Sequence, residues 1–139
     1  MKLFQIEEPL GGPADEDALG AAIGIDARGE RVAVAFSVGG NAEILRAPEG
    51  FLLSLAVPSL GALEEEWQRL FEAARTLAER ALARPVSHAV IAFRGTDERA
   101  AKDCLSAAAK RAGLSALRFS RSLSAEEAAV LAEELMPRN

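Results

Sequence analysis

The sequence predicts an α/β fold in which a mixed five-stranded sheet is built from elements in the order β-β-β-α-β-α-β-α. Three short apolar segments come first, separated by turn-forming residues. Two further apolar segments of strand length follow, and they alternate with three segments whose apolar residues recur at helical spacing. Strands joined by short turns are antiparallel, so the first three strands are predicted to form an antiparallel meander. Strands joined by crossover helices are parallel, so the last two are predicted to extend the sheet in parallel.

The antiparallel meander is predicted from apolar runs and the turns between them. Residues 27–30, Ala-Arg-Gly-Glu, have the composition of a turn, and Gly39-Gly40-Asn41 is a strong hairpin signal. Pro48 stops the third run. The predicted strands cover residues 21–26, 31–38 and 42–47.

The second half of the chain is predicted from helix start and stop signals. Ser59 is the expected N-cap of the first helix, and Pro85 ends it. Thr96 or Asp97 is the expected N-cap of the second helix, and Gly113 is the residue expected just beyond its end. Ser124 opens the third helix with a capping box. A near-continuous apolar run predicts that residues 86–93 form a strand buried on both faces. The predicted helices cover residues 60–82, 97–112 and 125–135, and the last strand covers residues 114–119.

Composition limits the classes of protein that this chain can belong to. Half of its 139 residues are apolar and the net charge is −5, which excludes a disordered acidic chain. No apolar segment has the length of a membrane span or a signal peptide, so a cytoplasmic protein is predicted with no membrane partner. A single cysteine excludes internal disulfides, and one tryptophan with no tyrosine argues against nucleic-acid binding. Residues 1–20 are predicted as a flexible acidic arm and residues 21–139 as a single domain.

Several segments resemble, in order, the DnaK-type (seventy-kilodalton heat-shock) chaperone ATPase domains. Residues 22–26, Ala-Ile-Gly-Ile-Asp, resemble the family's first phosphate motif. Residues 83–93 resemble the helix end and strand before its proline-containing loop, and residues 97–119 resemble its next helix and strand. The resemblance covers about residues 21–135. It implies a ribonuclease-H-like fold, namely one half of an actin-like ATPase domain.

The chain departs from the family in the first phosphate loop. The family reads Asp-Leu-Gly-Thr-Thr, whereas this chain reads Asp26-Ala27-Arg28-Gly29-Glu30. The resemblance therefore implies that Asp26, Arg28 and Gly29 form a vestigial phosphate loop, with at most a degenerate site for ATP and magnesium and no functional cofactor. Asp26 ends a strand at the carboxyl edge of the sheet, so its carboxylate is either a metal ligand or the cap of its own turn.

The family closes nucleotide between two lobes, whereas this sequence matches one lobe. The resemblance therefore implies no ATPase activity and predicts a non-catalytic, chaperone-ATPase-like interaction module. Apolar residues wrap around much of the last helix, in the region that faces the second lobe in the family. We therefore predict an interface that a homodimer or a second protein covers, formed by Leu123, Val130, Leu131 and Leu135.

Two other functions remain open at the level of sequence. One is a nucleotide-sensing module whose site is completed by dimerisation. The other is a metal-dependent, resolvase-like nuclease, which requires several carboxylates around paired metals. The last strand leads into Ser120-Arg121-Ser122, where that chemistry would require an acid. His88 and Cys104 are predicted to be structural residues, and Arg94, Arg118 and Arg121 form either a basic cluster or a solvated surface.

Overall fold

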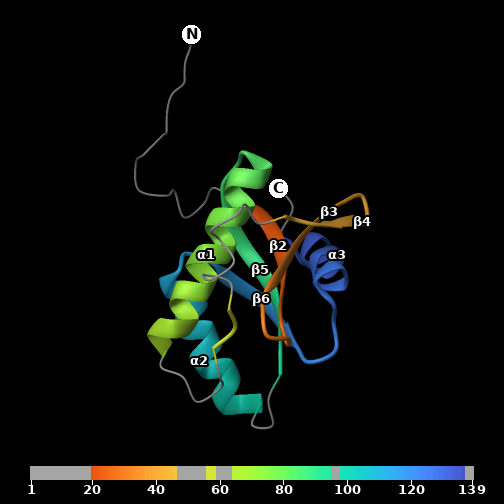
Figure 1. The fold of residues 1–139 in the computed structure, drawn as a ribbon. Helices are drawn as coiled ribbons and strands as arrows, with labels where there is room; N and C mark the ends of the chain where they lie inside the picture. The colour runs from red at the N-terminus through yellow and green to blue at the C-terminus, as the bar shows by residue number, and fades with distance from the viewer. Residues whose placement is uncertain (1–19, 47–55, 59–63, 95–97, 137–139) are drawn as a thin grey trace.

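The structure is a computed structural model in which a five-stranded mixed sheet lies between two layers of helices (Figure 1). It describes residues 20–46, 56–58, 64–94 and 98–136, so the predicted arm at residues 1–20 lies outside the described residues except for Gly20. The α/β class and the mixed five-stranded sheet are confirmed. The elements, in chain order, are β2 (Ala21–Ala27), β3 (Ala33–Val38), β4 (Asn41–Ile44), α1 (Glu64–Leu82), β5 (Val86–Phe93), α2 (Glu98–Arg111), β6 (Ser115–Ser120) and α3 (Ala125–Leu135).

The strands lie in the order β4-β3-β2-β5-β6 across the sheet. β2 pairs antiparallel with β3 and parallel with β5, while β4 pairs antiparallel with β3 and β6 pairs parallel with β5. The carboxyl ends of β2, β5 and β6 therefore meet at one edge of the sheet. Helices α1 and α2 pack against each other and cover one face, and α3 covers the opposite face, mainly over β2 and β3 (Figure 1).

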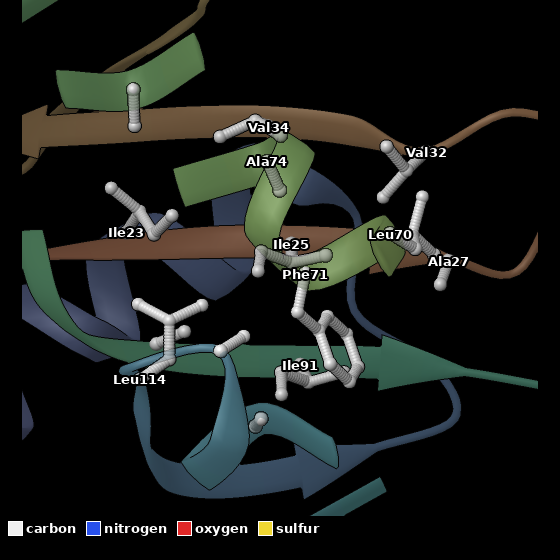
Figure 2. Packing of buried hydrophobic residues seen from close by; sticks show 14 of the residues in the cluster. Ile23, Ile25, Ala27, Val32, Val34, Leu70, Phe71, Ala74, Ile91 and Leu114 are labelled. Atoms are coloured by element: carbon white, nitrogen blue, oxygen red, sulfur yellow. The ribbon is translucent and has the colours of Figure 1, made fainter. Parts of the chain in front are cut away.

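The main core lies between the sheet and the α1–α2 layer. Helix α1 buries one stripe of side chains, and its first turn carries three glutamates that suit the positive end of the helix dipole. Figure 2 shows Phe71 of α1 beside Ile91 of β5, with Ile25 of β2 close by. β5 is buried on both faces, as its apolar run predicts, because Ile91 faces this core and Val90 faces α3. The stripe of α1 comprises Trp67, Leu70, Phe71, Ala74, Leu77 and Ala78.

Helix α3 lies unusually close to β2 because both elements are nearly free of side-chain bulk where they meet. A Cβ built on Gly24 would lie 2.3 Å from the backbone nitrogen of Ala129 and 2.5 Å from the carbonyl oxygen of Ala125. The alanines of α3 are buried against the sheet. These alanines account for much of the apolar surface of α3, which the sequence analysis assigns to an interface with a partner. They instead pack inside the domain, because small residues allow two backbones to approach closely.

A carboxylate of α3 fixes the β3–β4 hairpin. Gly39 and Gly40 have φ values of 60° and 85°, the conformation that a two-residue hairpin turn requires. Their backbone N–H groups donate to Glu133 over 2.7 Å and 3.0 Å, and the buried Ser37 hydroxyl donates to it over 2.7 Å. The predicted turn is therefore held in place by hydrogen bonds to a side chain of α3.

The strand and helix ends differ from the predicted ones by a few residues where local bonding decides them. The first strand continues to Ala27, because Ala27 pairs with Phe93 of β5. The second strand begins at Ala33, because Arg31 instead forms an isolated bridge with Ala56. Beyond α2, Gly113 has φ 87° and donates its N–H to Lys110, which confirms it as the residue that ends the helix. The predicted caps at Ser59, Thr96 and Asp97 lie outside the described residues.

Candidate functional site

The carboxyl edge of the parallel strands carries the predicted phosphate loop. On β2, alternate residues face opposite sides of the sheet, so Ile25 faces the main core whereas Gly24 and Asp26 face the α3 side. The structure therefore places Asp26 at the end of a central strand and on the face where α3 begins. Ligands of open α/β sheets bind at this edge.

The carboxylate of Asp26 forms an ion pair with Arg28, two residues further along the chain. The Nε of Arg28 donates to one carboxylate oxygen over 2.9 Å, and an Nη of Arg28 donates to the other over 3.0 Å. The backbone N–H of Arg28 donates to the first oxygen over 3.0 Å. Both oxygens are therefore engaged, and only 18% of the Asp26 side-chain surface is exposed. Within the predicted phosphate loop, Arg28 and Asp26 therefore form a bidentate ion pair.

The start of α3 lies within electrostatic range of this ion pair. Hydrogen bonding to Asp26 raises the pKa of Arg28, and the charge of Glu127 raises it further. Ser124 accepts from the Glu127 N–H over 3.1 Å and donates its own N–H to the Glu127 carboxylate over 2.9 Å, which confirms the predicted capping box. The bonds from Ser124 hold the pKa of Glu127 below its usual value. The environment of Arg28 thus contains two carboxylates, Asp26 and Glu127.

The residues of the predicted phosphate loop do not all converge on one point. Asp26 and Arg28 meet, whereas Gly29 is exposed and a Cβ built on it would meet only the carbonyl oxygen of Arg31, at 3.9 Å. Among the residues that the structure describes, no group of three or more His, Cys, Asp or Glu side chains is placed to hold a metal ion. A metal ion at Asp26 would compete with the guanidinium of Arg28, which already pairs with both carboxylate oxygens.

The predicted interface residues lie on and before α3 and are half-buried. Leu123, Leu131 and Leu135 pack against a small second core formed by alanines of β2 and α3 together with Val90 of β5. Val130 is half-buried but belongs to none of the buried clusters. Of the four residues, Val130 is therefore the one whose side chain can be changed with the least damage to the domain.

His88 lies at the opposite, amino-terminal end of β5. Its Nδ1 is 2.6 Å from the Ser87 hydroxyl, and this hydroxyl also accepts the Gly20 N–H over 2.8 Å. The tautomer of the His88 ring decides which of these two atoms donates the hydrogen bond. Cys104 packs against the main core, and burial raises the pKa of its thiol. Both positions agree with the predicted structural roles, and His88 pairs with Ala22, at the other end of β2 from Asp26.

The partial burial of His88 predicts a dependence of stability on pH. Burial lowers the pKa of His88, so the folded state binds this proton less readily than the unfolded state does. The stabilisation by neutral His88 is present above about pH 6.5 and is lost as the pH falls through that value toward the folded pKa. We expect Tm to fall further between pH 7.5 and 5.0 in the wild type than in His88→Asn. Equal falls in the two proteins, measured by circular dichroism, would contradict this prediction.

Two residues that fix how α3 packs against the sheet escape the sequence analysis. Gly24 sets the depth of α3 against β2, and Glu133 fixes the hairpin from 94 positions away in sequence. A glycine inside an apolar strand is a known signal of close backbone approach, so Gly24 could have been found. Nothing in the local sequence marks Glu133, because its partners are fixed only by the tertiary fold.

Two comparisons with known proteins identify no relative of this chain. No protein family model matches the chain. A search of curated proteins also gives no match. Within the described part of the chain, no helix is both long enough and apolar enough to cross a membrane.

Proposed function

We propose that this domain is a non-catalytic interaction module with a ribonuclease-H-like fold, similar to one lobe of the DnaK-type chaperone ATPases. The proposal takes a three-stranded antiparallel unit extended by two parallel strands, with helices on both faces, as the fold of that lobe. It assigns the protein to binding rather than to catalysis. The partner is a second copy of the chain or another protein, and it covers the outer side of α3.

The ion pair of Asp26 and Arg28 is the observation that carries the proposal. Both nuclease and magnesium-nucleotide chemistry at this edge use a carboxylate that coordinates a metal ion. Here, both oxygens of Asp26 accept from Arg28, at 2.9 Å and 3.0 Å. The residue after β6 is Arg121, where a nuclease would require a further acid. The ion pair and the arginine after β6 support a binding function without phosphate or metal chemistry at this edge of the sheet.

The first test measures nucleotide binding. A ligand at 100 times its Kd stabilises a folded protein by about 2.7 kcal/mol, which is readily seen as a rise in Tm. We expect Mg-ATP to leave the Tm of the wild type unchanged, and we expect no cleavage of branched DNA in magnesium or manganese. A Tm rise that is lost in Asp26→Ala would instead establish the nucleotide-sensing alternative. Cleavage of the DNA that requires Asp26 would establish the nuclease.

The second test measures self-association. We expect light scattering over a dilution series to show a concentration-dependent dimer, and Val130→Glu to give a monomer whose circular dichroism spectrum is that of the folded wild type. Glu126→Ala, at an exposed position near the start of the same helix, is the matched control and should still dimerise. A wild type that is monomeric at every concentration would exclude self-pairing and leave only a different protein as the partner.

A further inference from the structure

Helix α3 leaves part of its face of the sheet uncovered. Two helices, α1 and α2, share the opposite face, whereas α3 lies mainly over β2 and β3 and has little contact with β6 (Figure 1). β6 lies two strands beyond β2, and neighbouring strands are about 4.8 Å apart. Packed helices lie about 8–10 Å apart, so the described part of the chain leaves room for one more helix over β6, beside α3.

Three half-buried leucines, which we name the apolar strip, border this space. Leu117 comes from β6. Leu131 and Leu135 come from the side of α3 nearest β5 and β6, because both pack in the same cluster as Val90 of β5. The other side of α3 carries Glu133, which holds the β3–β4 hairpin. Each leucine of the strip is partly exposed, so the strip offers apolar surface to a further helix.

An exposed cation and an exposed acid lie beside the apolar strip. Arg118 of β6 is opposite Val90 in the register, so its side chain leaves the sheet on the face that α3 covers. Glu126 and Val130 are four residues apart and share the outer side of α3, since the inner side is buried against the sheet. Among the residues that the structure describes, none forms an ion pair with Arg118 or Glu126.

The strand register places Arg118 at the level of the first turns of α3. Gly24 lies opposite Val90, and Val90 lies opposite Arg118. Helix α3 meets Gly24 through backbone atoms of residues 125–129, a stretch that includes Glu126. Arg118 and Glu126 therefore lie at about the same level along the strands. Within one chain they are kept apart by the two strands that separate β2 from the far side of β6.

We infer that the α3 helix of a second copy of the chain fills the place over β6. A two-fold axis that runs along the helices and between them generates this arrangement. The two α3 helices then lie side by side in one layer between the two sheets, and each α3 covers β6 of the other copy. Rotation about this axis keeps the level of every residue along it. The inference rests on the proposed interaction function and adds which surfaces of the two copies meet.

Charge favours this arrangement over a direct contact between the outer sides of the two helices. Such a contact would bring Glu126 and Glu134 of one copy against the same glutamates of the other. Over β6, Glu126 instead faces Arg118 of the other copy at the same level, and the symmetry forms this pair twice. Val130 packs on Leu117 of the other copy, and the two apolar strips meet across the axis.

The test exchanges the two charges and measures dimerisation of the full chain by light scattering over a dilution series. We expect Arg118→Glu to weaken dimerisation about tenfold or more, because it places two acids face to face in both symmetric contacts. Glu126→Arg should weaken it for the same reason. The double variant Arg118→Glu/Glu126→Arg restores the pair in reverse order and should dimerise within about threefold of the wild type. Glu126→Ala opposes no like charges and should still dimerise, since an exposed ion pair contributes little.

The matched control is Arg84→Glu, which makes the same change of charge at an exposed position between α1 and β5 and should dimerise as the wild type does. Equal weakening by Arg84→Glu and Arg118→Glu would reduce the effect to net charge and overturn the inference. A dimer that Arg118→Glu leaves intact, or that the double variant fails to restore, would also overturn it and leave the proposed interaction module standing. A wild type that stays monomeric would overturn it and leave a different protein as the partner. Circular dichroism checks that each variant is folded.

Discussion

Gly24→Ala is expected to destabilise the domain by about 3 kcal/mol, at the upper end of the usual cost of overpacking. The added methyl group would lie 2.3 Å from the Ala129 nitrogen, 2.5 Å from the Ala125 carbonyl oxygen and 2.8 Å from the Ala128 carbonyl carbon. All three atoms belong to the backbone of α3, so no side chain can rotate away. The helix must move off the sheet, and the second core beneath it is opened. The urea midpoint of unfolding, followed by circular dichroism, measures this loss.

Gly29→Ala is the matched control for this substitution. The same methyl group at Gly29 would have the Arg31 carbonyl oxygen as its nearest atom, at 3.9 Å, and the backbone there is free of the left-handed strain that favours glycine. We expect a change within about 0.5 kcal/mol, as for most surface substitutions. Similar losses at Gly24 and Gly29 would show that general effects of removing glycine, rather than the closeness of α3, explain the result.

Phe71→Ala is expected to cost about 3–5 kcal/mol, the usual range for removing a buried phenylalanine ring. Phe71 is fully buried at the centre of the main core, beside Ile91 as Figure 2 shows, and its ring centroid lies 6.0 Å from that of Trp67. Its removal leaves a cavity between α1 and the sheet that the surrounding strands cannot fill. The measurement is again the urea midpoint, with the slope of the transition checked to be unchanged.

Val38→Ala provides the comparison for the loss of apolar volume. Val38 ends β3 and is 65% exposed, so little apolar surface returns to water when its methyl groups are removed. A loss below about 0.5 kcal/mol is expected. If Phe71→Ala cost no more than Val38→Ala, the packing of α1 on the sheet in the structure would be wrong.

The elements of the fold were readable from the sequence because their signals are local. The apolar run of β5 predicts its bounds without error, and the capping box at Ser124 predicts the start of α3. Gly113 marks the end of α2 through its positive φ, which few other residues adopt. The least accurate bounds are those of β3 and β4, where pairing across the sheet decides the strand ends more than the composition of each strand does.

The candidate site was readable only in part. The sequence places Asp26 at the end of a strand and Arg28 two residues later, and it leaves open whether Asp26 is a metal ligand or the cap of its own turn. The structure adds a two-pronged contact from the Arg28 side chain, since rotamers and distances are not encoded in spacing alone. The apolar excess of α3 shows the same limit. Composition shows that α3 is rich in apolar residues. It cannot distinguish alanines that pack closely inside the domain from apolar residues that bind a partner protein.

By itself the sequence determined the α/β class, the five strands and the turn and cap residues, because hydrophobic periodicity and backbone preference act over a few neighbouring residues. Only the tertiary structure decided how deeply α3 sits on Gly24 and that Glu133 holds the Gly39–Gly40 turn. Each of these depends on residues far apart in the chain. Their contacts follow from the order and register of strands in the sheet, which no local preference specifies.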